Sequence, residues 1–439
     1  MTSYAVGYVP WPEPEDPPPS APCPAAGVSC SSDDAHFLAY HQRDPSLVLH
    51  KALYFLLCAA LAAYVPYLVQ WMQSVGLSPL EAGSIFALGQ VTGIVAAPLL
   101  SRLADTSSAM RRALLLSAMA CQVLALLAMS ACTSYAAIAA CFVACEVCTV
   151  TVFPLLDASI QRLLTAVHGS ADGYGHTRAW GAAGWGLAGW AFGAAYDALG
   201  GHSHLFTFFA LTQLPCLALA ARLPLERRAA SAASDAAAWT ALLRLDFLAV
   251  AAVLTLCSLL LTALDLYRFS YLETLGASNA LMGLSLAAAS LSETPFFFFT
   301  QAILRRTGVG SALVVVALGY AARFAWYAAL QDPRATVPAE LLHGLTFALS
   351  WAAATQYVGE LLPPELASTG QGVLSAIVWG VGGSLGSLYG GAAVGQWGWR
   401  AMWLGGVGIA LAAAGLMAVT LVACPARRKG AGGEAAGGG

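Results

Sequence analysis

The sequence is poor in charged residues. Asp, Glu, Lys and Arg together make up 10% of its 439 residues, whereas a soluble globular domain contains roughly 25%. Hydrophobic residues make up 59% of the chain. A chain of this composition is expected in a lipid bilayer, and its formal net charge of −3 gives no reason to expect a nucleic-acid partner.

The sequence also lacks the motifs that carry enzymatic chemistry. It contains no recognisable nucleophile and base pair, no phosphate-binding loop and no set of metal ligands, so neither an enzyme nor a cofactor is expected. Most of the eleven cysteines lie within apolar segments and indicate no disulfide framework. The chain does not open with a basic segment followed by an apolar core, so a cleaved signal is not expected either.

Apolar runs close to the ~20 residues that a membrane-spanning helix needs begin at residue 51. They predict an all-α membrane protein with twelve transmembrane helices, at residues 51–72, 80–103, 113–132, 135–163, 178–199, 205–223, 245–273, 279–304, 311–330, 337–361, 368–396 and 399–423. The predicted organisation is a proline-rich acidic tail (1–45), a first half (46–223), a polar central loop (224–244), a second half (245–424) and a glycine-rich tail (425–439). The two halves therefore contain six helices each.

The distribution of arginine and lysine predicts the orientation. Sixteen of the twenty basic residues lie in the two tails and in alternate loops, and basic residues in short loops stay cytosolic. Both termini are therefore expected in the cytosol.

An internal repeat relates the two halves. Pro98 and Pro295 lie 197 residues apart. Trp185-Gly186 of helix 5 repeats in helix 11 as Trp379-Gly380, at an offset of 194 residues, and Tyr196 repeats as Tyr389, at an offset of 193. Such an offset across six helices predicts two parallel halves related by an axis along the membrane normal.

Three segments resemble the major facilitator superfamily. They are Tyr174–Gly181 (YGHTRAWG), Ser292–Phe298 (SETPFFF) and Glu340–Phe347 (ELLHGLTF). The resemblance is to the branch of major-facilitator-associated domains, with relatives among nucleoside:proton and lactose:proton symporters. It implies a central site exposed alternately to each side of the membrane, with helix 5 against helix 8 and helix 2 against helix 11.

Glu293 is the leading candidate for a substrate or proton site. A carboxylate at membrane depth is costly and usually faces a pathway or a partner, although a purely structural ion pair is the alternative. Pro295 is expected to bend helix 8 near Leu291. The candidate partners of Glu293 are Arg323, Arg268 and His343.

Further polar residues fall within the predicted helices. Asp265 and Arg268 lie three residues apart on one helix face and could neutralise each other, with Tyr267 beside them, or could sit at the membrane interface. Glu146 is the deeply placed acid of the first half. It could carry a proton, or it could accept a hydrogen bond from a nearby hydroxyl. Glu340 and His343 form a Glu-x-x-His pair without a second copy, which favours a hydrogen-bonding histidine over a metal ligand.

Ion pairs and glycines are expected to control movement of the halves. The candidate gating residues are Asp105, Asp157, Arg162, Arg178, Arg305 and Arg306, with an ion-pair cluster around Arg178 holding one conformation closed. The loop around Asp105 matches the superfamily signature only in a degenerate form. Small residues allow close helix approach, either for gating or for static packing, and the candidates are Gly181, Gly184, Gly380 and Gly383.

These observations predict a secondary transporter of a small polar or organic solute. Alternating access, proton coupling through Glu293 or Glu146, a monomeric state and a plasma-membrane location are expected. Apart from the solute, protons and the bilayer, no partner is expected. The alternative is a facilitator-type fold that serves as a membrane receptor or scaffold without transport, which the degenerate loop and the long polar tail would fit.

Overall fold

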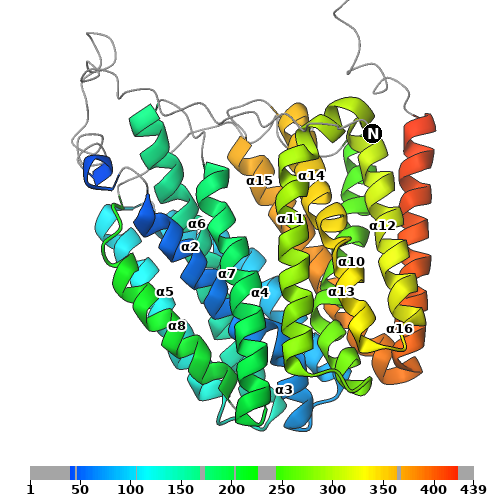
Figure 1. Ribbon diagram of the computed structural model, residues 1–439. Coiled ribbons are helices and arrows are strands. Elements are labelled where there is room, and N and C mark those ends of the chain that lie inside the picture. The colour runs from blue at the N-terminus through cyan, green and yellow to red at the C-terminus, as the bar shows by residue number, and fades with distance from the viewer. Residues whose placement is uncertain are drawn as a thin grey trace, which may run out of the picture.

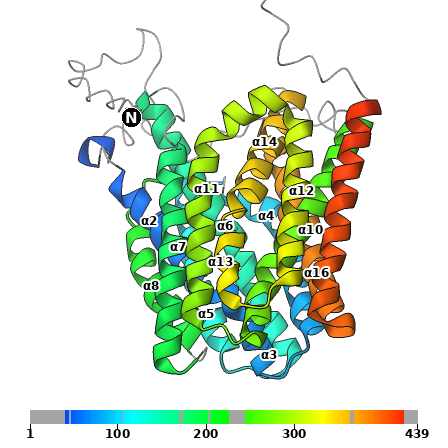
Figure 2. The same ribbon diagram turned by 45° about the vertical axis from the view of Figure 1, so that its right-hand side comes forward.

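The computed structural model describes residues 40–44, 47–104, 106–168, 174–201, 204–225, 244–362 and 367–423, and these residues form helices joined by short loops. Asp105, the central loop from 226 to 243 and most of both predicted tails lie outside the described residues. Figures 1 and 2 show a bundle in which most helices run nearly parallel to one long direction.

The first half contains six helical rods. The first rod joins α2 (Val48–Tyr64), the short 3₁₀ turn η1 (Val65–Tyr67) and α3 (Leu68–Ser74). The others are α4 (Pro79–Ala104), α5 (Ser108–Met129), α6 (Tyr135–His168), α7 (Tyr174–Leu199) and α8 (Leu205–Ala220). Capping side chains begin several of them; for example, the Ser107 hydroxyl accepts from the Met110 N–H at 3.0 Å at the start of α5.

The second half repeats this order. It contains α10 (Leu245–Thr274), α11 (Asn279–Thr307) and α12 (Val309–Ala329), followed by a broken rod of α13 (Thr336–Glu340), the π-helical turn η4 (Gly344–Ala348) and α14 (Leu349–Leu361). The last two rods are built from α15 (Ala367–Ser375), the π-helical turn η6 (Ala376–Gly382) and α16 (Gly383–Ala423). Within α16, Gly398 has a φ of 79° and marks the joint between the eleventh and twelfth rods.

Seven of the described helices are long and apolar enough to cross a membrane, and the bent α11 makes an eighth. One of the seven, Gly370–Ala423, consists of the two rods joined at Gly398. Counted as rods, the described helices number six in each half, which is the expected all-α membrane architecture.

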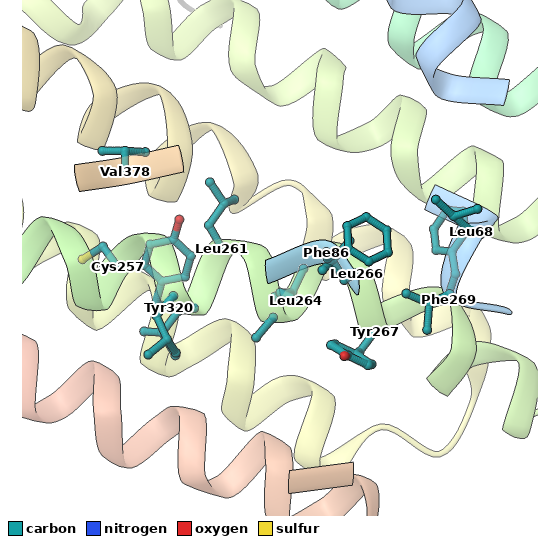
Figure 3. Packing of buried hydrophobic residues seen from close by; sticks show 14 of the residues in the cluster. Leu68, Phe86, Cys257, Leu261, Leu264, Leu266, Tyr267, Phe269, Tyr320 and Val378 are labelled. Atoms are coloured by element: carbon teal, nitrogen blue, oxygen red, sulfur yellow. The ribbon is translucent and has the colours of Figure 1, made fainter. Parts of the chain in front are cut away.

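The halves pack side by side, with the blue to green helices on one side and the lime to red helices on the other in Figure 1. Helix α7 packs against α11, and α4 packs against α16, as the family resemblance implied. One hydrophobic cluster crosses this junction. Figure 3 shows part of it, in which Leu68 and Phe86 of the first half belong to the same cluster as Leu266 and Phe269 of α10.

The two ends of the bundle differ in their loops. We call one the glycine end, because its turns contain Gly76, Gly200, Gly276 and Gly398, all with positive φ. We call the other the arginine end, because helices there end or begin with Arg102, Arg111, Arg112, Arg305 and Arg306. Arg112 donates to the carbonyls of Ala221 and Leu223 and so ends α8 at Ala220, three residues earlier than predicted.

Candidate functional site

The site is organised around the carboxylate of Glu340, which is fully buried at the end of α13. Its Oε2 pairs with Arg268 of α10 and with Arg323 of α12, the latter at 2.8 Å. Its Oε1 accepts from the Tyr327 hydroxyl at 2.6 Å. Both guanidinium groups are also almost completely buried, so three charged side chains from three rods share one dry position.

Arg323 extends this network toward the broken rod. Its Nη1 donates to the Thr346 hydroxyl at 2.9 Å and to Nδ1 of His343 at 3.3 Å. A planar guanidinium can address several acceptors at fixed angles, which a lysine ammonium cannot do. Arg323 thereby connects Glu340 to the histidine.

His343 continues the chain to α11. Its Nε2 lies 3.1 Å from Oε1 of Glu293. The side chains of His343 and Glu293 are 11% and 15% exposed, whereas that of Glu340 is 0% exposed. The hydrogen-bond chain therefore runs from a closed interior to a partly accessible carboxylate.

The two contacts of His343 define its protonation state. Because a guanidinium can only donate, Nδ1 of His343 must be the acceptor, and the remaining ring proton is on Nε2. This proton faces Oε1 of Glu293, which lies 3.1 Å from Nε2 and can accept it in a hydrogen bond. His343 is neutral in this arrangement.

Irregular backbone positions His343 between α13 and the π-helical turn η4. Gly344 packs directly on the backbone of Ser292 in α11, so that any side chain at position 344 would collide with it. The Gly344 N–H also donates to the Ser292 hydroxyl at 2.9 Å. π-helical turns are often found at functional sites, and here the break lets His343 reach both Arg323 and Glu293.

Asp265 adds another carboxylate near the network. It lies on α10, is half-buried, and is within electrostatic range of Arg268, Arg323, His343 and Glu340. Spacing along α10 suggested that Asp265 and Arg268 neutralise each other. In the described part of the chain Arg268 instead pairs with Glu340, because that carboxylate is brought against it by packing of the tenth rod.

Aromatic rings lie beside the polar network. The His343 ring stacks on Phe347, with centroids 5.4 Å apart and planes 18° apart. Trp379 of η6 lies 6.3 Å from Phe347 and 6.1 Å from Trp351 of α14. Trp379 is 46% exposed, so its ring is not part of the closed core.

The other predicted pathway residues lie apart from this network. Glu146 is half-buried on α6 against Gly89 of α4, and no hydrogen bond or ion pair joins it to another described residue. The fully buried Tyr267 donates to the carbonyls of Pro79 and Ser387, near the glycine end.

The predicted gating residues lie toward the arginine end. Arg178 Nε is 4.0 Å from Asp157, and the guanidinium lies over the rings of Tyr54 and Phe153. All four residues belong to the first half, and a gating role for Arg178 stays a prediction. Arg162 is half-buried, Arg305 and Arg306 are exposed at the end of α11, and Asp105 lies outside the described residues.

The bend of α11 lies later than predicted. The helix changes direction by 61° between Phe296 and Phe299, rather than near Leu291. Ser292 explains the difference, because its contacts with Gly344 and Ala289 fix the turn that precedes Pro295. The deformation falls on the turn after the proline.

The four predicted packing glycines serve two different contacts. Gly181 and Gly184 face α2 within the first half, where Gly184 lies on the backbone of Phe55. Gly380 and Gly383 face α4 of the other half, against Ile94 and Gln90.

One junction was not predicted from the sequence. At the glycine end, the Gln70 side-chain amide donates to Glu273 at 2.8 Å, and Asp197 accepts from the first residues of α11. A second repeat, at an offset of 200 residues, could have identified this region. Gly76-Leu-Ser-Pro-Leu-Glu-Ala-Gly83 and Gly276-Ala-Ser-Asn-Ala-Leu-Met-Gly283 share their two glycines and the serine.

Two parallel-repeat halves with charged groups buried between helices define a membrane transporter of the facilitator type. Comparison with known proteins gives the family. The chain matches the MFS_1 like family over residues 47–404 and belongs to it. The protein is therefore an integral multi-pass membrane transporter and not an enzyme.

Individual relatives agree with this assignment. The chain is 29% identical to a maltose permease of Geobacillus stearothermophilus over 350 residues, which cover 78% of this chain and 86% of the relative. It is 27% identical over 122 residues to major facilitator superfamily domain-containing protein 6-like protein B of Xenopus laevis, covering 28% of this chain and 20% of that protein.

Solved structures share the fold. The nucleoside transporter NupG superposes with a TM-score of 0.71 at 18% identity, covering 85% of this chain and 98% of that one. A bacterial homologue of the human lysosomal transporter Spinster, in an inward-facing and unoccupied conformation, gives a TM-score of 0.65 at 13% identity, covering 89% and 98%.

Proposed function

We propose that this transporter carries a small, neutral, hydroxyl-bearing solute together with a proton. The observation that supports this proposal best is the hydrogen-bond chain from buried Glu340 through Arg323 and His343 to Glu293. Such a chain links a partly accessible carboxylate to fixed buried charges on other rods. A scaffold has little use for so many costly groups within the membrane.

Charge balance favours proton binding. With Asp265, Glu293 and Glu340 ionised and His343 neutral, the network contains three negative and two positive charges. Unbalanced charge is unfavourable in a medium of low dielectric constant, so loss of contact with water favours uptake of one proton. Glu293 is the proposed proton carrier, because it is the most exposed member of the hydrogen-bond chain.

The same balance argues for an uncharged solute. Both arginines of the network pair with Glu340 and are at most 2% exposed, so neither guanidinium is accessible to an anionic solute in this conformation. Glu293 and His343 offer hydrogen-bond groups suited to hydroxyls, and the rings of Phe347, Trp351 and Trp379 offer flat apolar surface nearby. Sugars and nucleosides combine these two chemistries, and the relatives named for maltose and for nucleosides support this choice.

The proposal also includes the orientation of the protein in the membrane, its location and its oligomeric state. The arginine end is proposed to face the cytosol, following the distribution of basic residues, with both termini on that side. The plasma membrane is the proposed location and a monomer the proposed functional unit.

Thermal unfolding of the purified protein tests the proposal. We expect maltose, a panel of other disaccharides, or uridine to raise the unfolding midpoint, and we expect gluconate and uridine monophosphate to have no effect. Stabilisation should be greater at pH 6 than at pH 8, since the protonated network is the solute-binding form, and Glu293→Gln should remove this pH dependence. Stabilisation by the anionic compounds instead would contradict the assignment of a neutral solute. No stabilisation by any compound would favour a receptor or scaffold.

A further inference from the structure

The glycine end is closed by two contacts that are related by the internal repeat. The Tyr67 hydroxyl, from the first rod, donates to the carbonyl of Asn279 at the start of α11, at 3.4 Å. The Tyr267 hydroxyl, from α10, donates to the carbonyl of Pro79 at the start of α4, at 3.1 Å. Tyr67 and Tyr267 are 200 residues apart, as are Pro79 and Asn279. Each tyrosine therefore joins one half to the first helical turn of a rod in the other half.

Glycines allow the backbones to meet at the same two places. A side chain at Gly193 would collide with the Asn279 carbonyl, and one at Gly391 would collide with the Pro79 carbonyl. One turn further into the bundle, Gly283 faces the carbonyl of Gly189, and Gly83 faces that of Ser387. The close backbone packing of α7 against α11 is thus nearly equal to that of α4 against α16.

A carboxylate breaks this symmetry. Asp197, at the end of α7, accepts from the Asn279 N–H and the Asn279 side-chain amide, both at 2.9 Å, and from the Ala280 N–H at 2.8 Å. On the other side, Pro79 has no N–H to donate. There Glu81 accepts from Ser78 of its own loop. Asp197 therefore ties α7 to α11, and the matching position of α4 has no such link from the other half; the other carboxylate that joins the halves at this end in the described residues is Glu273 of α10, which accepts from Gln70.

Asp197 is not needed to begin α11. Ser278 already caps this helix, because its hydroxyl accepts from the Leu281 N–H at 3.2 Å. A carboxylate at a helix N-terminus interacts favourably with the helix dipole, and here that interaction acts between two halves. Separation of α7 from α11 at this end would break three hydrogen bonds of an ionised group that is itself exposed to solvent.

We propose that Asp197 is a latch that holds the glycine end closed and sets the balance between the two access states. Asp197 belongs to the first half and accepts hydrogen bonds from the N–H groups of Asn279 and Ala280, at the start of α11 in the second half. Loss of its charge favours opening at the glycine end, whereas the tyrosine and glycine contacts remain available for reclosure. This role differs from that of Glu293, and it does not depend on which solute is carried.

Reactivity of a buried reporter thiol tests the latch. Met282 is 1% exposed and lies one turn inside the junction, where Gln70 donates to its sulfur. In nanodiscs, Met282→Cys should react slowly with a hydrophilic maleimide, after subtraction of the parent protein without the reporter. Adding Asp197→Ala should raise this rate roughly fivefold or more, and Asp197→Asn by a smaller factor, because the amide retains one acceptor.

Ser278→Ala is the matched control. It removes the other cap of α11 without touching the contact between halves, so the reporter rate should stay unchanged. An equal rise in Ser278→Ala would assign the effect to fraying of the helix and overturn the proposal, as would an unchanged rate in both Asp197 variants. If Asp197→Ala does not fold, the reporter rates of Asp197→Asn and Ser278→Ala are compared. A higher rate in Asp197→Asn supports the latch, and equal rates contradict it. The assay uses no solute, so its outcome is independent of the proposed transport activity.

Discussion

Glu293 and His343 lie 3.1 Å apart across two rods of the second half, while the other ring nitrogen of His343 faces Arg323. The histidine is thus held between a carboxylate that can take a proton and a guanidinium that cannot lose one. Protonation of Glu293 would remove its negative charge, make it a poorer acceptor for Nε2 of His343 and so weaken the link between α11 and the tenth rod. A proton is in this way coupled to a contact between helices.

Replacement of Glu293 by glutamine should uncouple transport from protons. Glutamine keeps the size of the side chain but cannot exchange a proton. Under a gradient of one pH unit, one-to-one proton symport can drive about tenfold accumulation, because one unit corresponds to ~1.4 kcal/mol. Proteoliposomes containing Glu293→Gln should equilibrate radiolabelled maltose or uridine without accumulating it.

Glu360→Gln provides the control for this experiment. Glu360 is an exposed carboxylate of α14 that accepts only from nearby Gln356 in the described structure, so accumulation should persist. Accumulation that survives in Glu293→Gln would assign the coupling proton to another group, and Glu146 would be the next variant to measure.

Removal of the Glu340 carboxylate should destabilise the whole protein. Arg268 and Arg323 would then be left buried with no carboxylate between them, and breaking a buried ion pair costs about 3–5 kcal/mol. We expect Glu340→Ala to lower the unfolding midpoint by about 10 °C in detergent, and Glu360→Ala to leave it nearly unchanged. A Glu340→Ala protein as stable as the parent would mean that the arginines do not depend on this carboxylate.

Much of the fold follows from the sequence because apolar runs, separated by polar turns, determine where helices can lie. The predicted helix at 279–304 begins where α11 begins, at Asn279, because Ser278 is a favourable cap. The π-helical turns at Gly344 and Ala376 were not predictable, because they depend on contacts with neighbouring rods such as that between Gly344 and Ser292.

The candidate site was predictable as a set of residues, and His343 was among the expected partners of Glu293, but the other pairs were not predictable. Glu293, Arg323, Glu340 and His343 were all indicated, because buried ionisable groups stand out in an apolar chain. The partner of Arg268 was not, since spacing along α10 pointed to Asp265, whereas the packing of three rods brings Glu340 against it. Asp197 escaped notice because it lies at a helix end, where acidic residues are common.

Alanine at Gly83 or Gly283 should open the glycine end. The added methyl group at Gly83 would meet the Ser387 carbonyl and the Tyr267 hydroxyl, and that at Gly283 would meet the Gly189 carbonyl. These neighbours are mostly backbone atoms of the opposite half, so the halves must separate. In proteins carrying Met282→Cys, either substitution should raise maleimide reactivity by roughly tenfold, as expected for ~1.4 kcal/mol.

Gly372→Ala is the matched substitution for this pair. Gly372 is also helical, but a methyl group there would meet no atom within 4 Å, so reactivity should not change. An effect of Gly372→Ala as large as that of Gly83→Ala would show that helix propensity, rather than collision between the halves, controls the reporter.

The joint at Gly398 allows a comparison in which two alanine substitutions have opposite effects. Gly398 has a φ of 79°, where an L-residue costs roughly 1–2 kcal/mol, although an added Cβ atom there would meet no other atom within 4 Å. Gly415 also has free space, but it lies in regular helix, where alanine is favoured over glycine by about 1 kcal/mol. Gly398→Ala should therefore lower the unfolding midpoint by a few degrees, and Gly415→Ala should raise it slightly. Equal effects of the two substitutions would contradict a strained turn at Gly398 and would mean that the last two rods form one continuous helix.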